Sequence, residues 1–228
     1  MTFSTNSAIF VATCIRCFYK PDVLDIYKYN RRKPSGLFDT LDKRIFRKDI
    51  LALRLKMPGD DVLNSSKAIF NTLISLDVFK NSFVVALYAP FKNEADLMPL
   101  LDIKGKQFVF PKVKKGTRKL EFYEVTSLKD LTAGSYGILE PVEELVSVNI
   151  DKIEFFAVPG VAFSQKCERI GYGGGYYDST LLHRSLNSTV AGIAYDLQIV
   201  ESGFSTDGDQ PVDMVITETR IFKNITTS

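Results

Sequence analysis

Hydrophobic residues recur at helical spacing in the segment that follows position 40. Phe46, Ile50, Leu53 and Met57 are three or four residues apart, which places their side chains on one face of a helix. A proline and a glycine follow Met57 directly, and this pair is typical of a helix end. The pattern predicts a first helix that ends there and a second helix from residue 60 to about residue 78.

The next hydrophobic pattern is that of a buried strand. Ser82–Tyr88 is an almost continuous apolar run of strand length, as expected for a strand covered on both faces. Strands alternate with helices beyond it, which favours a three-layer α/β/α domain with a largely parallel, mixed central sheet. A helix is predicted at 94–101, and further strands are predicted at 107–110, 120–125, 153–158, 189–194 and 212–217.

Length and composition indicate one globular domain with an extension. The chain has 228 residues, of which 45% are hydrophobic and 25% are charged, and we expect a single domain over 41–228. Its net charge of +2 lacks the basic excess that a general nucleic-acid binder needs. The apolar run near the N-terminus is too short to span a bilayer, so no membrane partner is expected.

Residues 1–40 differ from the rest of the chain. They contain no acidic residue before Asp22, whereas serine, threonine and basic residues are present, a composition close to that of a mitochondrial import signal. A disordered extension explains the same composition equally well. The compartment, cytoplasmic or mitochondrial, therefore stays open.

The scarcity of histidine and cysteine excludes several chemistries. Cys14-x-x-Cys17 has no second ligand pair at a spacing suited to structural zinc. A Ser-His-Asp triad would have to use His183, which has no nucleophile motif nearby and reads as an exposed helix residue. The chemistry is therefore sought among the other polar residues.

The richest candidate is a glycine loop between a strand and a helix. Four glycines occur within positions 171–175, and their backbone N–H groups can turn toward one anion, beside the N-terminus of the following helix. Arg169 can add a charge-assisted contact to phosphate, and Asp178 can hold Mg²⁺ against it. The loop lacks the Gly-Lys-Ser/Thr of a Walker A motif. A tight structural turn is the alternative interpretation.

Three other features suggest a binding site. Lys43, Arg47 and Arg54 project from one side of the first helix, either into a cleft or as a solvated face. The segment 88–94 leaves the carboxyl end of a buried strand, where ligands bind in open α/β sheets. Tyr136 lies in a glycine-flanked loop, where it can stack on a flat ring or simply anchor the loop.

Taken together, these segments resemble the 5-formyltetrahydrofolate cyclo-ligase family, also called methenyltetrahydrofolate synthetases. The similarity covers about residues 41–219, and the glycine-tyrosine block is its most specific part. The family implies ATP- and Mg²⁺-dependent cyclisation of 5-formyltetrahydrofolate to 5,10-methenyltetrahydrofolate, with ADP and phosphate released through a phosphorylated formyl intermediate. The matching segments are Lys43-x-x-x-Arg47, 88–96, 110–113, 136–141, 158–178, 198–200 and Asp209-x-x-x-Asp213.

The resemblance also implies residue roles. Lys43, Arg47 and Arg169 are expected to act in catalysis, and Asp178 and Asp209 are expected to bind Mg²⁺. ATP contacts are expected from Lys43, Arg47, Arg169, Gly171, Gly173, Gly174, Gly175, Tyr176 and Tyr177. Folate contacts are expected from Arg47, Ala89, Glu94, Tyr136, Tyr172, Gly173, Gly174, Gly175 and Tyr176. The substrate, with or without a polyglutamate tail, and ATP are the expected partners of a monomeric enzyme.

Four positions depart from the family pattern, namely Ser164, Cys167, Ser179 and Gly208. None of them is a residue assigned to ATP or Mg²⁺, but they put the geometry of the loop and the rate in question. Two alternatives therefore stay open beside the cyclo-ligase. One is a folate- or nucleotide-binding relative without turnover, and the other is an unrelated small-molecule kinase that uses the same loop.

Overall fold

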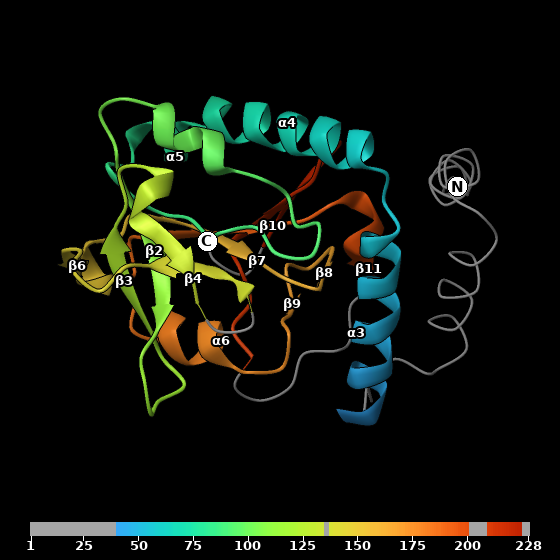
Figure 1. Ribbon diagram of the computed structural model, residues 1–228. Coiled ribbons are helices and arrows are strands. Elements are labelled where there is room, and N and C mark those ends of the chain that lie inside the picture. The colour runs from blue at the N-terminus through green and yellow to red at the C-terminus, as the bar shows by residue number, and fades with distance from the viewer. Residues whose placement is uncertain (1–39, 135–136, 201–208, 225–228) are drawn as a thin grey trace. The chain divides into compact units, whose positions relative to one another are not determined.

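A mixed eight-stranded sheet forms the centre of the computed structural model, which describes residues 40–134, 137–200 and 209–224 (Figure 1). The strand order is β13-β12-β10-β7-β1-β2-β3-β6. The five strands from β12 to β2 are parallel, whereas β13, β3 and β6 run antiparallel to their neighbours. The strands are β1 (Val84–Ala86), β2 (Gln107–Val113), β3 (Leu120–Glu124), β6 (Ser147–Val148), β7 (Phe155–Pro159), β10 (Thr189–Ile193), β12 (Met214–Ile216) and β13 (Ile221–Lys223).

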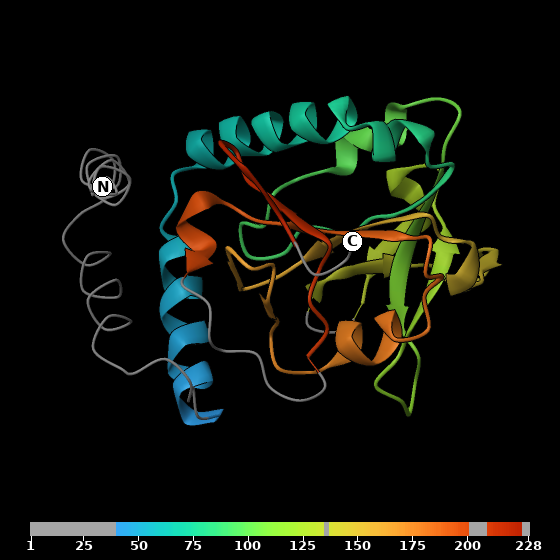
Figure 2. The ribbon, with the colours of Figure 1, turned by 180° about the vertical axis from the view of Figure 1, so that it is seen from behind.

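Helices cover both faces of this sheet. α4 (Gly59–Ser75) and α5 (Asp77–Asn81) lie over one face, and α6 (Tyr176–Leu181) lies over the other (Figures 1 and 2). α3 (Thr40–Leu55) stands beside the sheet, where it packs near the short 3₁₀ helix η5 (Asp196–Gln198). The three-layer α/β/α architecture with a largely parallel sheet is therefore confirmed.

The central strands are buried on both sides, because successive side chains of a strand point to opposite faces. Val85 and Phe155 join the hydrophobic cluster beneath α4 and α5. Their neighbours Val84, Ala86 and Phe156 join the cluster beneath α6. This explains why the sequence of β1 reads as a continuous apolar run rather than an alternating one.

Two small sheets lie outside the central one. β8 (Ala162–Ser164), β9 (Arg169–Ile170) and β11 (Ile199–Val200) form one, and β4 (Leu131–Ala133) and β5 (Leu139–Pro141) form the other. The first matters for the site because β9 carries Arg169 and leads into the glycine loop. The remaining 3₁₀ helices are η1 (Met98–Asp102), η2 (Leu128–Asp130) and η4 (Ile150–Lys152).

Three local predictions were wrong. The second helix is interrupted at Leu76, which has extended backbone angles, so α4 and α5 are separate. The helix predicted at 94–101 is only the 3₁₀ turn η1, because Lys92 and Asn93 adopt left-handed angles and the chain before η1 is held in a turn. His183 is exposed but follows the end of α6, where its ring lies 3.0 Å from Lys119 Nζ.

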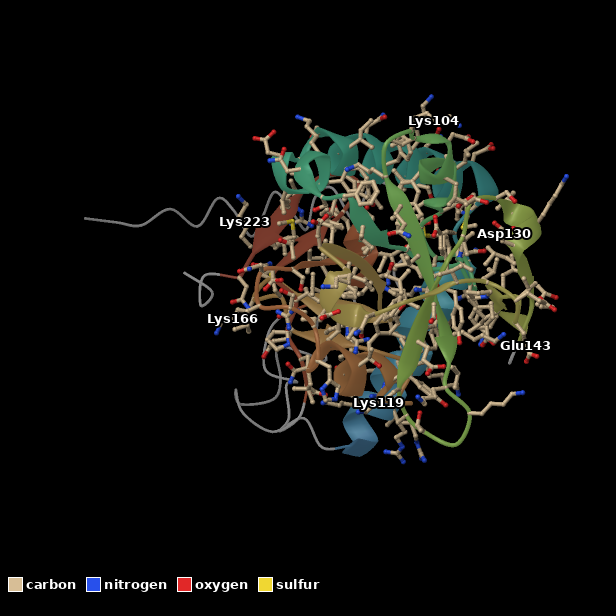
Figure 3. All side chains as sticks on the ribbon, turned by 90° about the vertical axis from the view of Figure 1, so that its left-hand side faces the viewer. Lys104, Lys119, Asp130, Glu143, Lys166 and Lys223 are labelled. Carbon is tan, nitrogen blue, oxygen red and sulfur yellow. The ribbon has the colours of Figure 1, made fainter. Side chains whose placement is uncertain are left out.

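Charged side chains such as Lys104, Lys119 and Lys166 point away from the fold (Figure 3). In the described part of the chain, no helix is both long and apolar enough to cross a membrane. The predicted extension, apart from Thr40, lies outside the described residues, and so do Cys14, Cys17, Tyr136 and Gly208.

Candidate functional site

The glycine loop connects β9 to α6 and has the backbone that its composition predicts. Gly173 has φ +102° and Gly175 has φ +68°. Residues other than glycine adopt such backbone angles only with strain. Gly175 is the residue before α6, a helix of six residues. The helix is short, so backbone N–H groups and nearby cations, rather than a long helix dipole, must supply the positive potential here.

Arg169 is held at the base of this loop. It is 6% exposed, its Nη2 donates to Asp178 Oδ1 at 2.7 Å, and its guanidinium lies 5.4 Å from the ring centroid of Tyr177. Its Nε–H is buried and has no hydrogen-bond acceptor among the described residues. A buried donor without an acceptor is costly, so this atom is consistent with a site that a ligand completes.

Lys43 comes to the same place from α3. Its Nζ lies 2.8 Å from Asp209 Oδ2, and the side chain is only 9% exposed. The next residue, Gln210, donates its backbone N–H to Asp178 Oδ1 at 3.3 Å. The two carboxylates expected to bind a metal therefore belong to adjoining segments, and each is paired with a cation expected to bind phosphate.

Arg47 completes the cationic group. Its Nε donates to the carbonyl oxygen of Gly171 at 2.8 Å, and a Cβ placed on Gly173 would lie 3.8 Å from its Nη1. Burial lowers the pKa of Arg47, whereas Asp209 and Asp178 raise it. The guanidinium stays charged, because even a lowered arginine pKa lies far above neutrality.

Three cations and two carboxylates thus meet beside a backbone suited to phosphate. Among the described residues no group of three or more His, Cys, Asp or Glu side chains could hold a metal ion. Mg²⁺ in nucleotide sites usually takes only one or two carboxylates and completes its shell with phosphate oxygens and water. Asp178 and Asp209 fit that donor set.

A second group of polar residues lies beyond the loop after β1. Glu94 is 5% exposed, and its Oε1 accepts a hydrogen bond from the Tyr172 hydroxyl at 2.8 Å. Its Oε2 accepts the backbone N–H of Phe91 at 3.1 Å, and Arg54 Nη2 lies 3.4 Å from Oε1. Tyr172 is the second residue of the glycine loop, so one hydrogen bond joins Glu94 to that loop.

Electrostatics in this second group follow from burial. Burial raises the pKa of Glu94, against the opposing effects of Arg54 and of the hydrogen bond from Tyr172. Burial also raises the pKa of Tyr172 and of Tyr177, and the nearby Glu94 carboxylate adds to both shifts. The two phenols are therefore protonated hydrogen-bond donors at neutral pH.

The remaining candidates lie on the same segments. Ala89 is buried in the chain that leaves β1, five residues before Glu94. The ring of Tyr176 folds back over Gly174, where an added Cβ would lie 2.7 Å from the ring. The described candidates thus gather in two adjoining groups, and the assignment of Tyr136 to the folate stays a prediction.

Sequence analysis missed the function of Arg54. It placed this residue with Lys43 and Arg47 on one basic strip, yet Arg54 is 1% exposed and bonds to protein groups rather than to solvent. The signal that could have found it was its position in the last turn of the helix, beside the apolar stripe. A cation there faces the loops that follow the strands.

Two of the four departures from the family pattern have a structural account. Ser164 is fully buried, and its Oγ accepts the backbone N–H groups of Lys166 and Glu168, each at 3.1 Å. It thereby closes the turn that leads to β9. Cys167 has φ +63°, a conformation suited to glycine, and its thiol is buried in the core, where its pKa rises to about 11.

Comparison with known proteins gives a consistent assignment. The profile of the 5-formyltetrahydrofolate cyclo-ligase family matches residues 39–218. A probable 5-formyltetrahydrofolate cyclo-ligase of Schizosaccharomyces pombe is 31% identical over 196 residues, 77% of this chain and 95% of that protein. A mitochondrial 5-formyltetrahydrofolate cyclo-ligase of Arabidopsis thaliana is 25% identical, over 82% of this chain and 77% of that protein. A solved structure, the 5,10-methenyltetrahydrofolate synthetase of Aquifex aeolicus, aligns with a TM-score of 0.70 and 37% identity, over 80% of this chain and 93% of that one.

Proposed function

The chain belongs to the 5-formyltetrahydrofolate cyclo-ligase family, and we propose that it uses ATP and Mg²⁺ to convert 5-formyltetrahydrofolate into 5,10-methenyltetrahydrofolate, ADP and phosphate. The observation that carries the proposal is the meeting of Lys43, Arg47 and Arg169 with Asp178 and Asp209 at the glycine loop. This donor set suits a triphosphate with its metal.

The proposed reaction has two steps. The formyl oxygen attacks the γ-phosphorus of ATP, the bond to ADP breaks, and the N5 lone pair forms a C=N bond to the formyl carbon. N10 then attacks that carbon, the C–O bond breaks with phosphate as leaving group, and N10 loses its proton. Phosphoryl transfer needs mainly positioning and charge stabilisation, so a site without a protein nucleophile is sufficient.

The roles of the side chains follow from their positions. Arg169 and Arg47 flank the glycine loop and would bind phosphate oxygens as ADP leaves, with Lys43 beside them. Asp178 and Asp209 would hold Mg²⁺, which neutralises charge on the phosphates when bound. Glu94 would accept a hydrogen bond from the pterin, since one lone pair of its Oε2 remains after the bond from Phe91.

The wider context of the enzyme is also proposed here. A monomer is proposed as the active unit. A relative named as mitochondrial supports an organellar location, with the cytoplasm as the alternative. The substrate is proposed with or without a polyglutamate tail.

The test is a cyclisation assay on the purified chain. Protein with 5-formyltetrahydrofolate, ATP and Mg²⁺ is expected to produce the absorbance of the methenyl product, and omission of ATP or addition of a chelator should abolish it. Arg169→Ala should lower the rate, since it removes a charge-assisted contact. Folate binding without an ATP-dependent product would instead support a relative without turnover, and a phosphorylated product without any folate would support the small-molecule kinase.

A further inference from the structure

Arg54 is a fully buried cation that bonds to three separate segments. Its guanidinium is 1% exposed and comes from the last turn of α3. It donates to protein acceptors on the loop after β1, on the loop after β7 and on the glycine loop. These acceptors are Lys92 O at 2.9 Å, Gly160 O at 3.1 Å, Phe91 O and Glu94 Oε1 at 3.4 Å each, and the Tyr172 hydroxyl.

The buried guanidinium of Arg54 adds little to the stability of the fold, but it fixes the relative positions of its acceptors. Burying a guanidinium costs much of what its hydrogen bonds return, so an apolar residue of similar size would serve packing equally well. The planar fork, in contrast, sets the directions of several acceptors at once. Arg54 thereby fixes where Glu94 and Tyr172 lie relative to each other and to the two loops.

The hydrogen-bond count at Glu94 shows what this fixing achieves. Oε1 accepts two bonds, from Tyr172 and Arg54, and Oε2 accepts one, from the Phe91 N–H. A carboxylate has about four acceptor positions, so the protein fills all but one. The remaining position is on Oε2 and therefore has a defined direction.

We propose that Arg54 is the residue that positions Glu94 and Tyr172 for folate recognition, by fixing the direction of the Glu94 carboxylate and linking it to the glycine loop. The inference rests on the proposed function, in which Glu94 binds the pterin. Arg54 is a positioning residue in this proposal, because its guanidinium is buried and would act on the substrate only through Glu94.

Charge gives the proposal a distinctive consequence. The titratable groups that act on Glu94 are Arg54 from α3 and Tyr172 from the glycine loop, and Glu94 in turn acts on Tyr88 and on Tyr177 of α6. Burial raises the pKa of Glu94, and Arg54 is the cation that opposes this. Loss of Arg54 would raise the pKa further, so that the carboxylate becomes protonated at a higher pH than in the unaltered protein.

The experiment compares Arg54→Met, Arg54→Lys and Glu94→Gln in the full chain by titration calorimetry. Each variant is titrated with 5-formyltetrahydrofolate and with a non-hydrolysable ATP analogue between pH 6 and pH 9. Arg54→Met should weaken folate binding at least tenfold while nucleotide binding changes less than threefold, and folate binding should weaken further as the pH falls. Arg44→Met, at an exposed arginine of the same helix, is the matched control and should bind both ligands normally.

The other two variants separate positioning from folding. Arg54→Lys keeps the charge but not the fork, so folate binding should stay independent of pH and be at least threefold weaker than in the unaltered protein. Glu94→Gln should weaken folate binding without any pH dependence. If Arg54→Met does not fold, the Arg54→Lys result decides by itself, and unchanged folate affinity in that variant would overturn the proposal.

Failure of the inference differs from failure of the proposed function. Equal losses of folate and nucleotide binding in Arg54→Met, or a loss without pH dependence, would mean that Arg54 supports only the fold. An unaltered protein that binds no folate would instead refute the proposed substrate. Normal folate binding in Glu94→Gln would refute the role of Glu94 and, with it, the positioning role of Arg54.

Discussion

Lys43 Nζ lies 2.8 Å from Asp209 Oδ2, although 166 positions separate the two residues in the chain. Arg169 and Asp178 form a second such pair, with 2.7 Å between Nη2 and Oδ1. Each pair joins a cation proposed for phosphate to a carboxylate proposed for the metal. Binding of ATP with Mg²⁺ would exchange these partners, so that the cations face phosphate and the carboxylates face the metal while the local charge stays balanced.

Replacing Lys43 by Met tests the cationic half of this arrangement. Met keeps most of the side-chain length but removes the charge, so the KM for ATP should rise about tenfold or more, equivalent to about 1.4 kcal/mol. The KM for the folate should change little. Thermal stability should fall modestly, because the Lys43 side chain is only 9% exposed and the pair therefore contributes more than the roughly 0–1 kcal/mol of a fully exposed one.

The matched control for this variant is Lys48→Met, which alters an exposed lysine on the same helix. It should leave both KM values and the melting temperature unchanged. Steady-state kinetics at varied ATP and fixed folate measure the effect. If Lys43→Met and Lys48→Met have the same KM for ATP, Lys43 has no part in nucleotide binding.

Gly171 tests the position of Arg169 without removing it. A Cβ at this glycine would lie 2.7 Å from Arg169 Nη1, the mobile end of a side chain, so the arginine must shift while the backbone need not. Gly171→Ala should therefore raise the KM for ATP severalfold and leave the melting temperature nearly unchanged. Kinetics and calorimetry on the same preparation measure the two quantities.

Gly116 is the comparison for this variant, because its replacement should lower the melting temperature without changing the KM for ATP. It has φ +76° in the hairpin between β2 and β3, with open space around its Cα. Gly116→Ala should cost about 1 kcal/mol through backbone strain, lowering the melting temperature by about 2–4 °C, without any change in KM. A loss of stability in Gly171→Ala that matched or exceeded that of Gly116→Ala would contradict the proposed local effect on Arg169.

The sequence predicted the layers better than the details that build the site. Buried parallel strands such as β1 and β7 are long apolar runs, and this pattern identifies them and the α/β class. The short strands β8, β9 and β11 were not predicted. Strands of two or three residues form only through pairing with partners elsewhere in the chain. Glycine-rich composition predicted the loop, and the structure adds that Gly173 and Gly175 have left-handed angles, which glycine adopts without strain.

Arg54 and Glu94 show why the rest could not be predicted. Helical periodicity placed Arg54 on the same side of the helix as Lys43. Their partners depend on the folded loops, where Arg54 donates to backbone carbonyls and Lys43 pairs with Asp209. The helix predicted around Glu94 was wrong for the same reason. Its carboxylate bonds to the Phe91 N–H and to Arg54, and those bonds hold the chain in a turn that helix propensity does not anticipate.

Lys106 makes contacts away from the site that we expect to stabilise the fold. Its Nζ donates to the carbonyl oxygens of Phe79, Lys80 and Ser82 at the end of α5, and it lies 4.6 Å from the ring centroid of Phe79. Carbonyls at a helix end lack the usual donor from the following turn, and Phe79 O here accepts the backbone N–H of Ser82 at 3.2 Å in addition to Lys106. Lys106→Met should therefore lower the free energy of unfolding by about 1–3 kcal/mol.

Lys104→Met is the control for that measurement, because Lys104 lies two residues away and points into solvent (Figure 3). Surface substitutions of this kind change stability by about 0.5 kcal/mol or less. Urea denaturation of both variants gives the comparison. Equal midpoints for the two would show that the three carbonyl contacts of Lys106 do not contribute to stability.

Glu218 lies in the turn between β12 and β13, close to the end of β10. Its Oε2 accepts the backbone N–H of Asp196 at 2.9 Å. Burial, to which the Asp196 carboxylate adds, raises the pKa of Glu218 from 4.5 to about 7, while backbone hydrogen bonds and Arg220 oppose the shift. The folded protein thus binds this proton more tightly than the unfolded chain does.

The contribution of this group to the stability of the fold is therefore lost as the pH rises from about 4.5 to about 7. Over that range the unfolded chain releases the proton of Glu218. The folded protein must either keep this proton or bury a charged carboxylate. The effect of this one group amounts to at most about 3 kcal/mol. Glu218→Gln keeps an acceptor for Asp196 and cannot ionise, so it should be more stable than the unaltered protein at pH 8 and nearly equal to it at pH 5. Denaturation at both pH values measures this, with the exposed Glu143→Gln as control. A stability difference that is the same at pH 5 and pH 8 would show that Glu218 ionises as readily in the fold as in the unfolded chain.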